Sequence, residues 1–165
     1  MSDQNLQNFI DLSAVLTGLS ATLLAPSIDP INLPPLFFKT AQQGMGTAAF
    51  SNLLELYTSV KSQPPAQIAA AVLGSQDAQI AQGARSIMKL WLLGSWYQPY
   101  DLPQANKAKG DTAVVSDQAY KESWAWKIAQ SHPMGYSQYH FGYWAEQPPT
   151  LKQFTGVDAK EGQQP

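Results

Sequence analysis

The chain has 165 residues, the usual length of a single domain, and 44% of them are hydrophobic, which is enough to build a buried core. Charged residues make up only 13% of the sequence, about half of the roughly 25% typical of soluble domains. Such a surface is either solvated by amide side chains or covered by a partner, because interface centres are poor in charge and rich in aromatic residues. The net charge of −2 does not favour a nucleic-acid partner, and the absence of cysteine excludes a disulfide framework and a zinc–thiolate site.

The first residues carry no recognisable export signal. Residues 1–5 contain neither a twin arginine nor a basic run, and no long apolar stretch follows them. The longest apolar stretches also fall short of the roughly 20 residues that a membrane-spanning helix needs. We therefore expect the chain as given to be soluble.

Apolar residues at three- and four-residue spacing predict amphipathic helices along the first half of the chain. The first helix could be capped by Ser2 or Asp3 and ends at Gly18. After a loop, the prolines at 34–35 open a short helical segment, which the glycines within 44–46 break. The apolar stripe of the first helix comprises Leu6, Phe9, Leu12, Val15, Leu16 and Leu19.

Three further helices are predicted before residue 98. One covers 50–60 and is stopped by the prolines at 64–65, and a short one follows over 68–73. Ser75 is expected to cap the next helix, which runs to about Tyr97. Its apolar face comprises Ile80, Ala84, Ile87, Leu90 and Trp91.

The composition becomes polar after this helix. Residues 99–110 are rich in proline, lysine and glycine and predict a surface loop. Residues 112–115 are too short to predict a sheet, although they could pair locally. Ser116 is expected to cap a last helix that carries Tyr120, Trp124 and Ile128 before Pro133 and Gly135 end it.

The end of the chain has a different character. Residues 134–165 show no sustained helical period and predict an extended tail, aromatic at first and polar at its end. All five tryptophans lie after residue 90. An aromatic segment without periodicity needs a surface to lie on, and tyrosine and tryptophan dominate interface hot spots. We predict a helical domain over 1–133 and a tail over 134–165 that packs on a partner or on the helices.

Residue patterns that indicate catalysis are scarce. The two histidines, His132 and His140, have neither the spacing of a metalloprotease pair nor that of a zinc finger. Gly44 and Gly46 lack the third glycine of a dinucleotide fingerprint and lie between helical segments. No phosphate-binding loop or nucleophile elbow is present. We predict no catalytic residue, no cofactor-binding residue and no metal ligand.

Three segments, in order, resemble a known family. Residues 9–18 read Phe-Ile-Asp-Leu-Ser-Ala-Val-Leu-Thr-Gly, residues 87–94 read Ile-Met-Lys-Leu-Trp-Leu-Leu-Gly, and residues 142–148 read Gly-Tyr-Trp-Ala-Glu-Gln-Pro. Together they resemble the small subunit of bacterial membrane-bound, FAD-dependent sugar and sugar-alcohol dehydrogenases, such as the glucose, sorbitol and fructose dehydrogenase complexes. Each motif alone is weak, but the three in order are fairly specific.

The resemblance implies an accessory subunit without a cofactor of its own. In such complexes a large flavoprotein subunit of the glucose–methanol–choline oxidoreductase type holds FAD and an iron–sulfur cluster. A multihaem cytochrome c subunit, which carries haem c, anchors the complex to the membrane. The small subunit binds the large one, is needed for its maturation and usually carries the twin-arginine signal. A periplasmic location, peripheral to the inner membrane and with membrane contact only through the complex, is therefore implied.

The sequence departs from the family pattern in two places. Some relatives carry a cysteine directly after a tyrosine shortly before the last motif, whereas here Ser137 follows Tyr136. An intersubunit disulfide is therefore impossible at this position. The middle motif has Leu90, Trp91 and Leu92 where alanine, tryptophan and tyrosine are common.

These observations predict an all-α fold, a small multi-helix bundle with an extended aromatic-rich C-terminal tail. Two alternatives to the accessory subunit stay open: a cytosolic helical adaptor or dedicated chaperone, and a small self-contained ligand-binding helical protein. The sequence does not indicate the substrate, because substrate contacts would lie on the large subunit. The residues expected to bind the partner are Trp91, Tyr136, Tyr139, Phe141, Tyr143, Trp144 and Pro148.

Overall fold

The computed structural model describes residues 3–98 and 112–135. These residues form helices and one two-stranded sheet, so the predicted all-α fold is confirmed. The chain divides into two units, Met1–Pro133 and Met134–Pro165. The tail predicted over 134–165 falls outside the described residues except for its first two. None of the helices within the described ranges has the length and apolar character needed to cross a bilayer.

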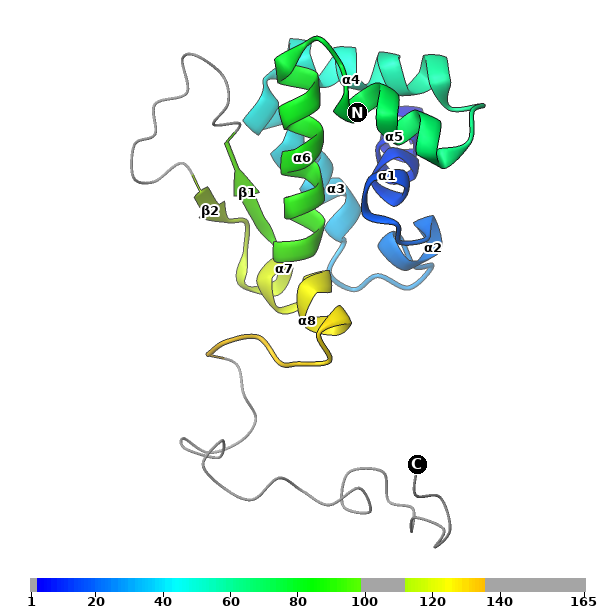
Figure 1. Cartoon of the computed structure of the whole chain (residues 1–165). Helices are drawn as coiled ribbons and strands as arrows, with labels where there is room; N and C mark the ends of the chain where they lie inside the picture. The colour runs from blue at the N-terminus through cyan, green and yellow to red at the C-terminus, as the bar shows by residue number, and fades with distance from the viewer. Residues whose placement is uncertain (1–2, 99–111, 136–165) are drawn as a thin grey trace, which may run out of the picture. The chain divides into compact units, whose positions relative to one another are not determined.

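The secondary structure follows the chain from the N-terminus as shown in Figure 1. The helices are α1 (Asp3–Thr17), α2 (Ala21–Leu24), α3 (Leu33–Met45), α4 (Thr47–Val60), α5 (Pro65–Leu73), α6 (Ala78–Leu93), α7 (Asp117–Lys121) and α8 (Trp124–Ile128). The strands are β1 (Ser95–Tyr97) and β2 (Thr112–Val114), which pair antiparallel with Trp96 opposite Ala113.

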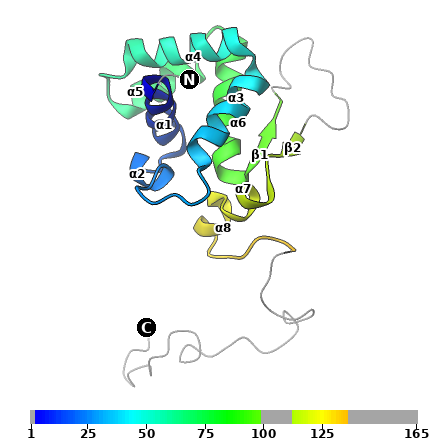
Figure 2. The ribbon, with the colours of Figure 1, turned by 180° about the vertical axis from the view of Figure 1, so that it is seen from behind.

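Helix α6 is the centre of the helical domain. It packs against α1, α3, α4 and α5, and its C-terminal end contacts α8 and leads into β1. Figures 1 and 2 show α4 crossing one end of α6 while α7 and α8 lie at the other. Because neighbours surround it, α6 buries more than one narrow stripe. Its buried residues are Ile80, Ala81, Gly83, Ala84, Ser86, Ile87, Leu90 and Trp91.

An aromatic cluster fills the core between α1, α3, α4 and α6. Phe37 meets the Trp91 ring edge to face at a centroid distance of 4.7 Å. Phe38 and Phe50 form a second edge-to-face pair at 4.9 Å, and Phe9 lies 5.6 Å from Phe38 and 6.4 Å from Trp91. Such pairs add about 0.5–1.5 kcal/mol each to the gain from burying their area. The cluster therefore fixes how these four helices pack.

The predicted break at 44–46 is partly wrong. Helix α3 continues through Gly44 to Met45, and Gly46, with φ of 81°, separates α3 from α4. Gly44 is present for another reason, because the ring of Trp96 occupies the space where a β-carbon would stand. By contrast, Gly18 ends α1 as predicted, with φ of 74°.

Both predicted ends of the α6 helix need correction. The residue that caps it is Asp77, whose carboxylate accepts the Gln79 N–H at 2.8 Å, and not Ser75. The helix stops at Leu93 instead of running to about Tyr97, because Gly94 turns the chain with φ of 64°. Residues 95–97 then pair with residues 112–114, so the local pairing predicted for 112–115 is confirmed.

The last predicted helix is in fact two short ones. Ser116 caps α7 as predicted, with its hydroxyl accepting the Ala119 N–H at 3.1 Å. The helix breaks after Lys121, because Ser123 is extended, with φ of −62° and ψ of 144°, and is buried. The four-residue helix α2, capped by Ser20, was not predicted because it is too short for a periodic signal.

We predict that Gly44→Val destabilises the domain by about 1–3 kcal/mol, because the added side chain must displace the buried Trp96 ring. Chemical denaturation followed by circular dichroism measures the loss. Gln43→Val on the same helix is the control, since residue 43 is exposed and its change should stay within about 0.5 kcal/mol. Equal stabilities for the two variants would show that Trp96 does not need the glycine.

Candidate partner-binding groove

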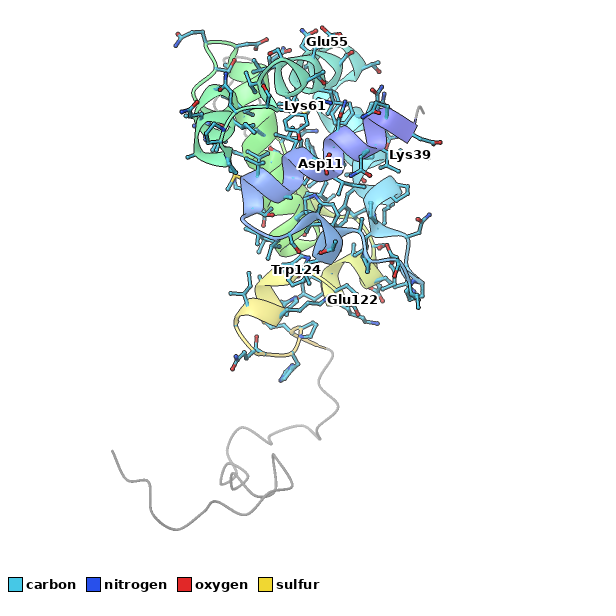
Figure 3. All side chains as sticks on the ribbon, turned by 90° about the vertical axis from the view of Figure 1, so that its right-hand side faces the viewer. Asp11, Lys39, Glu55, Lys61, Glu122 and Trp124 are labelled. Carbon is cyan, nitrogen blue, oxygen red and sulfur yellow. The ribbon has the colours of Figure 1, made fainter. Side chains whose placement is uncertain are left out.

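A groove of about 240 Å³ lies at the α8 end of the helical domain. One wall is the segment 23–33, which connects α2 to α3, and the other is formed by Glu122 and α8. Trp91 of the central helix also lines it. Figure 3 labels Glu122 and Trp124 at this end of the molecule. We call this feature the α8 groove.

The loop that forms one wall is held by a single carboxylate. Asp29 Oδ1 accepts the backbone N–H groups of Ile31 and Asn32 at 3.0 and 2.8 Å, and Oδ2 accepts that of Leu33 at 3.0 Å. These N–H groups belong to the turn that begins α3 and would otherwise lack helical partners. Asn32 adopts φ of 58°, a left-handed conformation that asparagine tolerates better than most residues. These bonds therefore fix the conformation of the loop.

The opposite wall is stabilised by contacts within residues 120–127. Lys127 bonds Glu122 at 2.9 Å and places its ammonium 4.9 Å from the centroid of the Trp124 ring. The indole N–H of Trp126 donates to the Tyr120 carbonyl at 3.1 Å, and the two rings meet edge to face at 5.6 Å. The Glu122–Lys127 pair is solvent-exposed, so it contributes little to stability. Its main effect is to leave neither charge free at the groove.

Large apolar side chains are exposed on the wall formed by residues 23–33. Ile28 is 85% exposed and Leu23, in α2, is 52% exposed. Ile128 on α8 is 63% exposed but does not line the groove. A single exposed aliphatic residue is ordinary, whereas several around one hollow mark an interaction surface. No residue of α8 is fully buried, although its sequence is Trp-Ala-Trp-Lys-Ile. Among the described residues, apolar area at this end is therefore exposed.

Two polar groups beside the groove lack hydrogen-bond partners among the described residues. They are the indole N–H of Trp91 and the hydroxyl of Ser123, and both atoms are buried. An unsatisfied buried donor costs about 1–3 kcal/mol. Trp91 lines the groove, and Ser123 stands in the chain between two residues that line it.

A second hollow, of about 600 Å³, lies between α1, α3 and α4. Its floor includes Phe38 and Phe50, and its walls carry amides and hydroxyls. Several of these groups already bond to one another: Asn8 donates to Thr58 at 3.3 Å, and Ser51 donates to Glu55 at 3.3 Å. The first bond joins α1 to α4, the second lies within α4, and both satisfy part of the polar lining.

The structure places one of the predicted partner-binding residues, and it is not on the surface. Trp91 is 1% exposed and belongs to the core, so its ring offers the free domain no surface for a partner. The other predicted residues, Tyr136, Tyr139, Phe141, Tyr143, Trp144 and Pro148, lie outside the described residues. Sequence reasoning missed Leu23 and Ile28. The available signal was an isoleucine in a loop between two prolines, 26 and 30, where no helix could bury it.

The described residues contain no group of three or more His, Cys, Asp or Glu side chains placed to hold a metal ion. In comparisons with known proteins, no family model, curated protein or solved structure matches this chain.

We predict that Asp29→Ala lowers the free energy of unfolding by about 1–2 kcal/mol, because three backbone N–H groups lose their acceptor. Asp29→Asn should lose less, since Oδ1 can still accept two of these bonds. Urea titration measures both. The control is Ser27→Ala, a change at the exposed neighbouring residue. A loss for Asp29→Ala no larger than for the control would show that the carboxylate does not hold the loop.

Proposed function

We propose that this chain is the small, non-catalytic subunit of a membrane-bound flavoprotein dehydrogenase complex that oxidises a sugar or sugar alcohol. In this role it binds the FAD-containing large subunit, stabilises it and assists its maturation and export. FAD, the iron–sulfur cluster and haem c belong to the partner subunits. The complex is periplasmic and peripheral to the inner membrane.

The observation that carries a partner-binding role is the exposed apolar surface at the α8 groove. Ile28 stands on the loop that Asp29 orders, and Leu23 stands at the end of α2. The low charged fraction of 13% agrees with a chain whose surface is partly buried in an interface with another protein. The class of partner comes from the resemblance of the three sequence segments.

The first two of those segments meet inside the domain. Residues 9–17 lie in α1 and residues 87–93 in α6, and the rings of Phe9 and Trp91 are 6.4 Å apart. The apolar residues of these two motifs are packed in the core. The motifs therefore support a fold shared with the dehydrogenase small subunits that the sequence resembles. The third segment, residues 142–148, lies outside the described residues and is the one expected to contact the partner.

A second candidate function is favoured by the hollow between α1, α3 and α4. At about 600 Å³ it has the size of a small-molecule site, which would suit a self-contained ligand-binding protein. An absorbance spectrum of the isolated chain separates part of this alternative from the accessory role. A colourless protein without dehydrogenase activity agrees with the accessory subunit, and flavin, haem or metal bands would favour a cofactor carrier.

We predict that co-expression with the large subunit raises the yield of flavin-loaded large subunit. A partner that binds only the native state stabilises it by mass action, by about 2.7 kcal/mol at one hundred times the dissociation constant. Flavin bound per mole of large subunit is the measurement. The large subunit is identified beforehand by co-purification with the tagged chain from its own host. Equal flavin loading with and without this chain would exclude the maturation role.

We also predict that the aromatic tail binds the large subunit, with Tyr143 and Trp144 at the centre of its contact. Trp144→Ala should weaken the complex at least about tenfold, because large aromatic residues are common interface hot spots. Titration of the purified subunits measures the affinity, and the melting temperature of the free chain is the control. A large drop in that temperature with unchanged affinity would place Trp144 in this chain's own core instead.

A further inference from the structure

We infer that Met45 is a site of oxidation by peroxides and that its sulfoxide loosens the packing of α3 on α6. The thioether occupies a gap that Gly83 leaves in the central helix, and the oxidised side chain does not fit this gap. The inference goes beyond the proposed function and does not depend on it, because it rests on contacts inside the helical domain.

Gly83 stands where a helix normally avoids glycine. It lies in the interior of the 16-residue helix α6, and glycine is less favourable there than alanine because it loses more backbone freedom on folding. Its φ is not positive, so the backbone conformation does not require glycine. The reason for the glycine is therefore the space that its missing side chain leaves.

The end of the Met45 side chain fills that space. Its Sδ lies 2.6 Å and its Cγ 3.1 Å from the position that a β-carbon of residue 83 would take. Met45 is the last residue of α3, and its side chain is only partly buried at the edge of the core. Because hydrogen peroxide is little larger than water, it reaches this thioether without global unfolding of the domain.

The modification is a transfer of one oxygen atom to sulfur. A lone pair of Sδ attacks one oxygen of hydrogen peroxide, the S–O bond forms and the O–O bond breaks. The leaving hydroxide takes the proton of the transferred oxygen and departs as water. The sulfur loses two electrons and the peroxide gains them, and the product is methionine sulfoxide, a polar and chiral side chain.

The sulfoxide is unfavourable in the gap for two reasons. An added oxygen overfills a site where Sδ already touches the α6 backbone, and overfilling a packed site is destabilising. The new oxygen also needs a hydrogen-bond donor, and the backbone N–H groups around Gly83 are used within the helix. The oxidised side chain therefore leaves α6, and the contact is lost at the end of α3 that joins α4.

The other methionines provide internal controls. Met134 is 74% exposed, so its sulfoxide remains in water and should change the stability little. Met88 is partly buried in α6 and packs against the core, so it is the residue from which Met45 must be distinguished. Met1 lies outside the described residues.

The test treats the purified full-length chain with hydrogen peroxide, locates sulfoxides by peptide mass spectrometry and measures the melting temperature by circular dichroism. Oxidation of Met45 should lower the melting temperature by roughly 3–8 °C. Reduction by methionine sulfoxide reductases should restore it. Met45→Leu, which conserves volume, should show no such drop after treatment. Met88→Leu should show the same drop as the unchanged chain.

A second variant tests the gap itself. Gly83→Ala displaces the Met45 side chain before any oxidation, so peroxide should lower the melting temperature of this variant little further. A full further drop would show that the gap is not the cause.

Three other outcomes overturn the inference. In the first, Met45 stays unmodified while Met134 is fully oxidised. In the second, Met45 is oxidised and the melting temperature does not change. In the third, the drop persists in Met45→Leu and disappears in Met88→Leu, which would make Met88 the sensitive residue.

Discussion

The packing of the Trp91 ring is the interaction on which the rest of the domain depends. The ring projects from the central helix α6 and meets Phe37 of α3 and Phe9 of α1. Placing so large a side chain in the middle of a small domain requires the surrounding helices to converge on it. It also leaves α6 with neighbours on several sides, which explains why small residues such as Gly83 and Ala84 are buried along it. The same packing makes Trp91 a core residue, 1% exposed.

The two ends of the domain differ in chemistry as a result of this arrangement. Near α4, the hollow between α1, α3 and α4 has a polar lining whose groups partly bond to one another. Near α8, the described part of the core is covered by two five-residue helices, α7 and α8, and by a loop. Ile28 and Ile128 are exposed to solvent at this end.

Much of the fold could be predicted from the sequence because the long helices carry a strong period. Phe9, Leu12 and Leu16 in α1 and Phe50, Leu53 and Leu54 in α4 are buried as their spacing predicted. The errors arose where a tertiary contact decides a local feature. From the sequence, Gly44 was predicted to break the helix. In the structure it lies within α3, and the Trp96 ring occupies the space that a side chain at this position would need.

The candidate site was harder to predict for a related reason. An exposed isoleucine in a loop has no pattern of its own, and the α8 groove forms only when residues near 28 meet residues near 124. The predicted end of the α6 helix, at about Tyr97, was also wrong. Gly94 ends the helix, and residues 95–97 pair with residues 112–114 instead of continuing it. Long-range pairing of this kind leaves no trace in local spacing.

The pairing of β1 with β2 brings together the two ends of the chain segment that connects them. Tyr97 and Thr112 stand opposite each other at the ends of that segment, and the Val115 N–H bonds the Gly94 carbonyl at 3.1 Å on the other side of the strand pair. Since the free energy of closing a loop rises by only about 0.6 kcal/mol for each doubling of its length, an insertion between the paired strands is expected to change the stability of the helices little. An epitope or a fluorescent reporter inserted there would label the chain without changing any residue that lines the α8 groove.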